Sequence, residues 1–288
     1  MKNIYSVKGL YKKFGNNVLL NSISFSVRQG EVIGLVGHNG VGKTTLMKCI
    51  LGLSKTDGGG FTSDSNNRVN YENIGALIEY PGLYPFLTGM ENIKIFLKEV
   101  DKEKLFWMAK KLEFYDKLNI KVKNYSLGMK QKLGIIVALL QGKRFVVLDE
   151  PINGLDPKSI KAFREIIGKL SQEGVAFLIS SHVLSELENI VTRVLILDGG
   201  EIVQDILMSD KNKISLSTID NEKAAKLISS YVTDLTIGDS NVAFTYEKKD
   251  LNKIIKKLLI NEVTIVDIST SNSLEDILLG YSYKEGSE

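Results

Sequence analysis

Residues 37–45 read GHNGVGKTT and match the pattern G-x-x-x-x-G-K-[ST], which binds the phosphate groups of a nucleotide. They lie between an apolar run typical of a buried strand, 32–36, and a segment typical of a helix, 45–51. Backbone N–H groups of such a loop converge on phosphate oxygens, and the helix N-terminus adds positive potential. We expect Lys43 to contact the β- and γ-phosphates and the Thr44 hydroxyl to bind Mg²⁺. The nucleotide-binding residues predicted in this loop are Gly37, His38, Asn39, Gly40, Val41, Gly42, Lys43, Thr44 and Thr45.

A second candidate for chemistry is the pair of carboxylates, Asp149 and Glu150, that ends the apolar run 145–148. A carboxylate at the tip of a strand beside a phosphate loop is what Mg²⁺ requires. Asp149 is therefore predicted to bind the metal, directly or through water, and Glu150 to orient and deprotonate the attacking water. Alone, such a pair is equally typical of a solvated strand end or of helix capping, so the prediction depends on its surroundings.

Three further groups supply those surroundings. Ser126 precedes a predicted helix, where serine caps well, and Gly128 allows the backbone to approach a ligand closely. The sequence 154–157, GLDP, follows the carboxylate strand, and His182 follows the next strand at the edge where α/β sheets bind ligands. Each alone indicates only a capped helix, a turn or a structural histidine. Their occurrence together favours a nucleotide site.

Hydrophobic periodicity predicts the elements that position these residues. Segments 4–10 and 22–27 are predicted strands ahead of the phosphate loop, and 54–73, rich in Gly, Ser, Asp and Asn, is predicted to form turns and loop. Apolar strands alternating with helices predict a parallel α/β core. The later strands expected in this core are 74–78, 145–148, 175–179 and 194–197, and the helical segments are 84–118, 129–140, 159–170 and 184–190. A glycine turn at 198–200 predicts a hairpin from 194–197 into 201–203.

The pattern changes near residues 208–212. The order beyond it is β-α-β-β-α-β, which is the ferredoxin-like arrangement, followed by a last helix from Ser273. The expected strands are 213–218, 233–237, 241–246 and 263–268, and the expected helices are 221–229 and 250–260. We therefore predict two domains, 1–209 and 210–288.

Composition limits the classes of function. The chain has 288 residues, is 43% hydrophobic and 25% charged, and carries a net charge of only +3, which argues against a nucleic-acid partner. Its single cysteine, Cys49, excludes an internal disulfide framework. Because no apolar run approaches about 18 residues, we expect a soluble, cytosolic protein that would work at a membrane only by docking on another protein.

In their order along residues 1–209, these motifs resemble the ATP-binding subunit of ABC transporters. The resemblance implies that Phe14 stacks on adenine and that 126–131 is the signature loop, which grips the γ-phosphate of ATP held by a partner subunit. It implies that Asp156 lies in the loop that links the two sites and that His182 senses the γ-phosphate. The nucleotide contacts implied in the signature loop are Ser126, Gly128 and Gln131.

The resemblance also implies an architecture and partners. The fold would be α/β, a P-loop NTPase core with an N-terminal β-subdomain and a helical subdomain at about 84–127, plus the small α+β C-terminal domain. Two cassettes, as a homodimer or as a pseudo-dimer with a paralogous cassette, would enclose two ATP molecules. ATP with Mg²⁺ would close this dimer and hydrolysis would reopen it. The helical subdomain would contact integral membrane permease subunits at the cytoplasmic face of the cell membrane.

One residue departs from the family pattern. After strand 74–78 the family normally has a glutamine that contacts Mg²⁺ and the attacking water, whereas this chain has Glu79, whose carboxylate adds negative charge at the metal. Together with Tyr80-Pro81 and the segment 87–92, LTGMEN, Glu79 resembles exporter ATPases of lantibiotic self-protection and bacitracin resistance. The alternative is a tolerated Gln-to-Glu change in another exporter.

Two other classes share a phosphate loop. A soluble mechanoenzyme of the same superfamily usually carries a long coiled coil or tandem cassettes, and this sequence shows neither. The other class is a phosphoryl-transfer kinase or a GTPase, in which the loop 126–131 would have no role. A GTPase would also need Asn-Lys-x-Asp, but neither Asn212-Lys213 nor Asn252-Lys253 is followed by Asp at the required position. The sequence therefore favours the ATP-hydrolysing motor subunit of a bacterial exporter.

Overall fold

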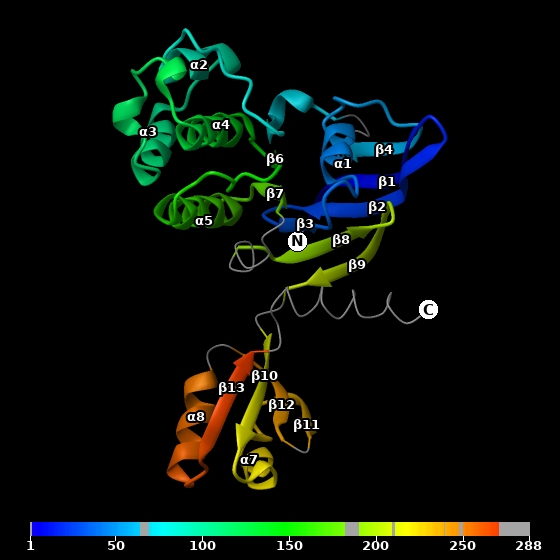
Figure 1. Cartoon of the computed structure of the whole chain (residues 1–288), viewed down its shortest axis with the longest axis vertical. Coiled ribbons are helices and arrows are strands. Elements are labelled where there is room, and N and C mark those ends of the chain that lie inside the picture. The colour runs from blue at the N-terminus through cyan, green and yellow to red at the C-terminus, as the bar shows by residue number, and fades with distance from the viewer. Residues whose placement is uncertain are drawn as a thin grey trace. The chain divides into compact units, whose positions relative to one another are not determined.

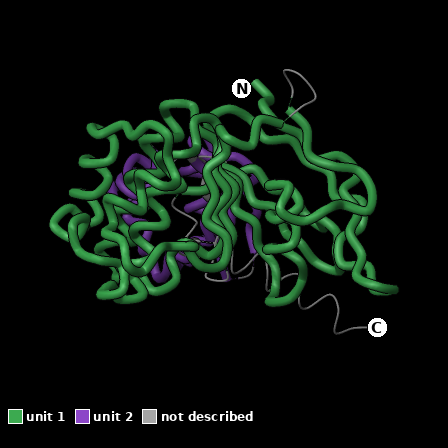
Figure 2. Tube along the Cα trace, turned by 90° about the horizontal axis from the view of Figure 1, so that it is seen from above, with its two compact units in different colours: residues 1–207 green, residues 208–288 purple. Residues whose placement is uncertain are grey.

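The computed structural model describes residues 2–63, 69–181, 190–208, 211–238, 240–247 and 250–270. Contacts between Cα atoms divide the chain into two units, residues 1–207 and 208–288 (Figure 2). Residues 184–189 of the helix expected at 184–190 lie outside the described residues. The helix expected from Ser273 lies wholly outside them. No helix in the described ranges is long and apolar enough to cross a membrane.

A six-stranded sheet forms the centre of the first unit, in the order β5-β6-β7-β3-β8-β9. Its strands are β3 (Val32–Val36), β5 (Ile74–Leu77), β6 (Phe145–Leu148), β7 (Ala176–Ser180), β8 (Arg193–Asp198) and β9 (Glu201–Leu207). Every residue of β3, β6 and β7 is buried, as expected for parallel strands covered on both faces. Only β9 is antiparallel to its neighbour, because the predicted hairpin at Asp198-Gly199-Gly200 reverses the chain. The predicted α/β core is confirmed.

A second sheet, in the order β2-β1-β4, forms the N-terminal part of this unit. It consists of β1 (Asn3–Phe14), β2 (Asn17–Arg28) and β4 (Gly58–Ser63), all antiparallel. The prediction of loop throughout 54–73 was therefore wrong. A Cβ atom on Gly59 would lie 2.1 Å from the carbonyl oxygen of Gly9, so glycine at this position permits β4 to approach β1.

Helices cover this core: the first lies beside β4, and the later α-helices gather at the end away from β1, β2 and β4 (Figure 1). They are α1 (Lys43–Ile50), α2 (Gly89–Phe96), α3 (Lys102–Lys111), α4 (Leu127–Gln141) and α5 (Pro157–Gln172), with short 3₁₀ helices at Tyr71–Asn73, Tyr115–Lys117 and Val122–Asn124. The helical stretch predicted at 84–118 is interrupted, because Thr88 caps α2 through a capping box with Glu91 and Asp101 caps a separate α3. Between α3 and α5, the Lys169 ammonium lies 4.3 Å from the centre of the Trp107 ring.

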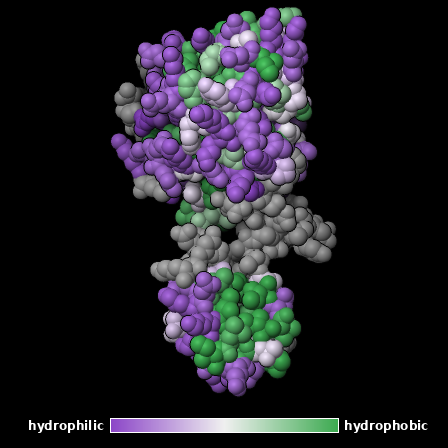
Figure 3. Space-filling view, turned by 90° about the vertical axis from the view of Figure 1, so that its left-hand side faces the viewer, coloured by the Kyte–Doolittle hydropathy of each residue, from purple (hydrophilic) through white to green (hydrophobic). Residues whose placement is uncertain are grey.

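The second unit contains β10 (Lys211–Thr218), α7 (Asn221–Ile228), β11 (Thr233–Ile237), β12 (Val242–Glu247), α8 (Leu251–Ile260) and β13 (Ile265–Thr270). Its strands form an antiparallel sheet in the order β11-β12-β10-β13. Phe244 and Leu216 of the sheet pack with Ile228 of α7 and Leu258 of α8 in a separate apolar core. Figure 3 shows that one face of this unit is strongly apolar.

Candidate nucleotide-binding site

The loop after β3 depends on glycine at three positions. Gly40 and Gly42 have φ angles of +85° and +112°, which residues other than glycine rarely adopt. A Cβ atom on Gly37 would lie 2.3 Å from the carbonyl oxygen of Leu197 in β8. The loop can therefore turn tightly at the end of the sheet and lead into α1, whose N-cap is Gly42.

Lys43 closes this loop from within. Its ammonium donates to the carbonyl oxygens of Gly37 at 2.6 Å and His38 at 3.1 Å. Burial lowers the pKa of Lys43, and the nearby carboxylates of Glu150 and Asp149 oppose that shift. A cation whose hydrogen bonds go to neutral carbonyls can pair with a phosphate anion, and the two nearby carboxylates favour a divalent cation beside that phosphate.

Asp149 is oriented by two hydroxyl groups. Thr44 Oγ1 donates to Asp149 Oδ2 at 2.7 Å, and Ser180 Oγ donates to Asp149 Oδ1 at 2.6 Å. The backbone N–H of Asp149 donates to the carbonyl oxygen of Leu77 at 2.8 Å. The Asp149 carboxylate is consequently fixed against the first turn of α1.

These oxygens suit a divalent cation that shares a nucleotide. Mg²⁺ commonly takes one or two carboxylates together with phosphate oxygens and water, rather than a cage made only of protein groups. Thr44 and Asp149 supply a hydroxyl and a carboxylate side by side. Among the described residues, no group of three or more His, Cys, Asp or Glu side chains could hold a metal by itself. The donor set thus fits Mg²⁺ bound with phosphate.

A cavity of about 220 Å³ brings the loop and the strand end together. It is lined by Leu19, Asn39, Gly40, Gly42, Lys43, Thr44, Thr45, Asp149 and Glu150. Glu150 has a φ angle of +48°, a conformation that costs a non-glycine residue about 1–3 kcal/mol and is common at functional sites. Its backbone N–H donates to Ser180 Oγ at 2.9 Å, so a hydrogen bond to the end of β7 helps to hold this strained residue.

Ser180 was not predicted, although the sequence contains the signal for it. It is the last residue of the buried strand β7, and Leu148 of β6 pairs with Ile179 of β7. The next residue of each strand, Asp149 and Ser180, therefore emerges at the same edge.

The structure does not place Glu79 beside Thr44 and Asp149. The Glu79 carboxylate contacts the Lys48 ammonium of α1 at 2.7 Å, and Glu79 has a φ angle of +58°. Glu79 is also absent from the residues that line the cavity.

The signature-loop residues likewise contact their own chain. Ser126 caps α4 by accepting from the N–H of Met129 at 3.2 Å. A Cβ atom on Gly128 would lie 2.7 Å from the carbonyl oxygen of Gly154. The Gln131 amide donates to the carbonyl oxygens of Pro151 at 3.0 Å and Glu150 at 3.4 Å. None of these signature residues lines the cavity that holds Lys43.

Asp156 caps α5. Its carboxylate accepts from the Ser159 hydroxyl at 2.7 Å and the Ser159 N–H at 2.9 Å, and Lys132 lies 3.3 Å away. The hydrogen bonds from Ser159, with a smaller contribution from Lys132, hold the pKa of Asp156 well below its usual range.

Two further predicted residues have exposed side chains, and a third is not among the described residues. Phe14, at the end of β1, is 58% exposed, and the Lys12 ammonium lies 5.0 Å from its ring centre. The His38 side chain projects outward, with Nε2 3.3 Å from Asp198. His182 lies outside the described residues.

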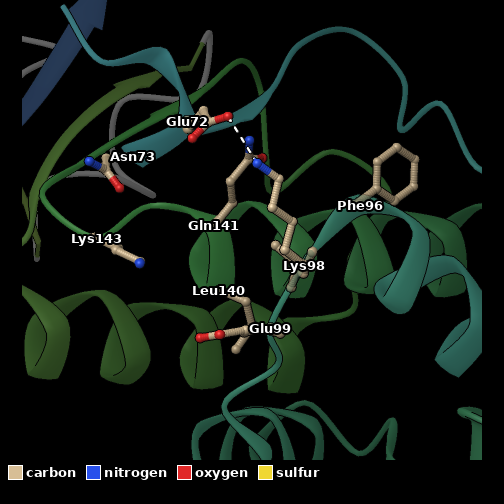
Figure 4. Close-up of a pocket in the computed structure, with 9 residues that line it drawn as sticks. Glu72, Asn73, Phe96, Lys98, Glu99, Leu140, Gln141 and Lys143 are labelled. Carbon is tan, nitrogen blue, oxygen red and sulfur yellow. Dashed lines mark hydrogen bonds and ion pairs between the residues drawn. The ribbon is translucent and has the colours of Figure 1, made fainter.

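A second cavity, of about 380 Å³, opens between the segment before β5, the end of α2 and the end of α4 (Figure 4). Lys98 crosses it to reach Glu72 at 3.2 Å (Figure 4). Phe96 and Leu140 contribute apolar surface. This cavity shares no lining residue with the first one.

A glycine loop after β3, a lysine within it, and a hydroxyl bonded to the aspartate after β6 define a P-loop nucleotide-binding core. Residues 20–153 match the ABC transporter family. An uncharacterized ABC transporter ATP-binding protein of Bacillus subtilis, YdbJ, is 36% identical over 95% of this chain and 93% of its own length. The chain belongs to this family and is the ATP-binding subunit of an ABC transporter.

Relatives with assigned transport roles are similar over much of the chain. The bacitracin transport ATP-binding protein BcrA of Enterococcus faecalis is 36% identical over 96% of this chain and 95% of its own length. The lantibiotic transport ATP-binding protein SrtF of Streptococcus pyogenes is 37% identical over 68% of this chain and 88% of its own. The predicted resemblance to this branch is confirmed.

Solved structures agree with the family. The ATP-binding subunit of an ABC transporter superimposes with a TM-score of 0.66 at 26% identity, over 72% of this chain and 91% of that one. A nucleotide-free ATP-binding cassette from an ABC transporter gives a TM-score of 0.63 at 24% identity, over 72% and 92%, and supports the fold.

Proposed function

We propose that this subunit hydrolyses ATP with Mg²⁺ to drive export. The observation that carries the proposal is the network Thr44–Asp149–Ser180 beside Lys43 in one cavity. Lys43 and the loop amides bind the phosphates, and Thr44 and Asp149 hold the metal. When bound, Mg²⁺ neutralises charge on the transferring phosphoryl group.

Glu150 is the proposed general base, acting on the attacking water. Its backbone is fixed by Ser180 on the N–H side and by Gln131 on the carbonyl side, and its side chain borders the cavity. His182, at the end of β7 in sequence, is the proposed sensor of the γ-phosphate, and Glu79 is proposed to lie near the metal during turnover. Phe14, which is largely exposed, is the proposed stacking partner of adenine.

The Glu150→Gln variant tests the assignment of Glu150 as general base. The variant should bind ATP, hydrolyse it about 10²–10⁴-fold more slowly, and accumulate as an ATP-bound dimer, because a general base contributes that factor. Hydrolysis by phosphate release and mass by analytical ultracentrifugation would be measured. Normal turnover in the variant would contradict the assignment.

The proposed dimer explains the signature residues. Ser126, Gly128 and Asp156 do not line the cavity of their own chain, whereas Leu127 beside them is 60% exposed. In a sandwich of two cassettes they would reach the nucleotide of the partner, which is a second copy or a paralogue. Gln131 would act indirectly, through the segment that carries Glu150.

The permease is proposed to dock beside the second cavity. Large apolar side chains are exposed in the loop after Glu79 and on α2, among them Tyr80, Phe86 and Ile95. With Phe96 at the cavity rim, they offer an apolar surface near the helical subdomain, of the kind that marks protein contacts. This position implies a peripheral subunit at the cytoplasmic face of the membrane.

The proposed cargo is an antimicrobial peptide of the bacitracin or lantibiotic type. The support is the similarity to BcrA and SrtF together with Glu79 at the glutamine position. The alternative is another exporter ATPase that tolerates glutamate. Recovery of a multi-span membrane protein in stoichiometric amount from native membranes, and peptide sensitivity on loss of the subunit, would support export of such peptides. Unchanged sensitivity would favour the alternative.

We also propose that residues 210–288 form a ferredoxin-like domain separate from a nucleotide-binding domain at 1–209. The support is the order of elements in the second unit and its antiparallel sheet β11-β12-β10-β13.

A further inference from the structure

The ion pair between Lys48 and Glu79 joins α1, which begins at the phosphate loop, to the loop that follows β5. Lys48 lies on α1, one turn after Thr44, so the two side chains share a face of the helix. Its Nζ atom lies 2.7 Å from Glu79 Oε1. The side chains are 35% and 56% exposed, so the contact is neither buried nor fully hydrated.

The backbone around Glu79 is restrained on the side of the active site. Leu77 pairs with Leu148 in the sheet, and its carbonyl oxygen accepts from the N–H of Asp149 at 2.8 Å. Glu79 comes two residues after Leu77 and has a left-handed φ angle of +58°. Since this conformation is costly for glutamate, the surrounding contacts must maintain it.

The loop is also restrained on the side of α4. A Cβ atom on Gly134 would lie 2.7 Å from Cβ of Pro81 and 3.0 Å from Cδ1 of Leu77. The loop therefore lies directly against the helix that begins with the signature residues. The Lys48–Glu79 contact joins α1 to this same loop.

The Lys48 ammonium and the Glu79 carboxylate also have opposite charges. A carboxylate near phosphates and without a partner opposes nucleotide binding, and a neighbouring ammonium offsets it. Lys48 lies in the last turn of α1, where the helix dipole also favours a cation. A glutamate in place of the family glutamine is thus accompanied here by a basic partner.

We propose that Lys48 is a positioning residue for Glu79: it holds the Glu79 loop against α1 and neutralises the Glu79 carboxylate one helical turn from Thr44 of the nucleotide site. The inference rests on the proposed function only in taking this cavity as the nucleotide site. It makes Lys48 and Glu79 a functional pair, so the effect of changing Lys48 should depend on the residue at position 79.

The test is a double-mutant cycle of Lys48→Met and Glu79→Gln, with ADP affinity measured by isothermal titration calorimetry in Mg²⁺ and in EDTA. In EDTA, Lys48→Met should weaken ADP binding about fivefold, because the unpaired carboxylate repels the phosphates. Mg²⁺ should reduce this loss. Glu79→Gln alone should stay within about twofold of wild type, and Lys48→Met added to Glu79→Gln should change the affinity by less than about a further twofold, because no carboxylate is left unpaired.

Two controls make the result specific. Lys48→Arg should retain wild-type affinity. Lys111→Met should change ADP affinity by less than about twofold, although Lys111 and Glu165 form a pair of the same 2.7 Å length and similar exposure between α3 and α5. An equal effect of Lys48→Met with either residue at position 79, or an equal effect of Lys111→Met, would overturn the proposal. The readout is ADP binding, so it is independent of ATP hydrolysis. Loss of the energetic coupling between Lys48 and Glu79 with intact hydrolysis would contradict only the role of Lys48. Absence of hydrolysis with intact coupling would contradict only the proposed ATPase activity.

Discussion

Gln131 donates a hydrogen bond to the carbonyl oxygen of Pro151 at 3.0 Å, and this contact ties α4 to the segment that carries Glu150. Gln131 is buried, so its amide is committed to this segment rather than exposed for a ligand. The helix that begins with the signature loop is thus hydrogen-bonded to the segment that follows β6. Gln131, which the family resemblance implies to be a nucleotide contact, thus makes its hydrogen bonds within its own cassette.

Gln131→Ala should therefore affect stability and catalysis more than binding. Loss of a buried hydrogen-bonding side chain costs about 1–3 kcal/mol in the free energy of unfolding, which urea denaturation would measure. ATP hydrolysis should slow while ADP affinity stays within about twofold. Gln172→Ala, at the exposed end of α5, is the control and should change neither. A loss of ADP affinity without loss of stability would show a direct nucleotide contact.

Gly128→Ala should be harmful although alanine favours helices. A Cβ atom there would lie 2.7 Å from the Gly154 carbonyl oxygen, so α4 or the loop at Gly154 must move, at a cost of about 1–3 kcal/mol. Gly168→Ala is the matched control: Gly168 lies in α5 with nothing within 4 Å of the added atom, so stability should rise by about 0.5–1 kcal/mol. Thermal unfolding of both variants would compare them. A gain in stability from both would contradict the close approach.

Lys43→Ala should weaken ATP binding at least about tenfold, because it removes a buried cation that faces the phosphate site. It also removes the two hydrogen bonds to Gly37 and His38, so the loop should become more accessible to hydrogen exchange. Fluorescent-nucleotide titration would measure the affinity. Unchanged binding would count against the phosphate-loop assignment.

Asp156 should give a defined dependence of stability on pH. Its pKa in the folded chain lies below that of an unfolded aspartate, about 3.9, so its contribution is fully present above about pH 4 and is lost as pH falls through the folded-state pKa. Asp156→Asn can still cap α5 but lacks the charge. The difference in Tm between wild type and Asp156→Asn should thus narrow from pH 7 towards pH 3. A constant difference would show that the charge contributes nothing.

The sequence predicted the core and the chemistry best where local pattern and buried position coincide. Short apolar runs between turn signals are typical of buried strands, and parallel strands end at one edge, so the proximity of Thr44 and Asp149 followed from their positions. β4 was missed because Gly58-Gly59-Gly60 is typical of loops. Its strand conformation comes from pairing with β1 around Gly9, a contact between distant segments.

The contacts around Glu79 and Gln131 were beyond a pattern-based prediction for a different reason. Glu79 and its partner Lys48 are 31 residues apart in the sequence, and Gln131 and its hydrogen-bond acceptor Pro151 are 20 apart. Neither contact repeats with a helical or strand period. The residue types indicated a ligand, and only the folded chain shows which neighbours they engage first.

The stacking of Lys169 on Trp107 gives the protein a built-in optical probe. Trp107 is the chain's only tryptophan, and a cation 4.3 Å above its ring should quench and shift the indole emission. Fluorescence excited at the red edge, where tyrosine does not absorb, would then respond to a change in the separation of α3 and α5 without an attached dye. Nucleotide-driven movement of the helical end of the cassette could be timed by stopped flow on the unmodified chain.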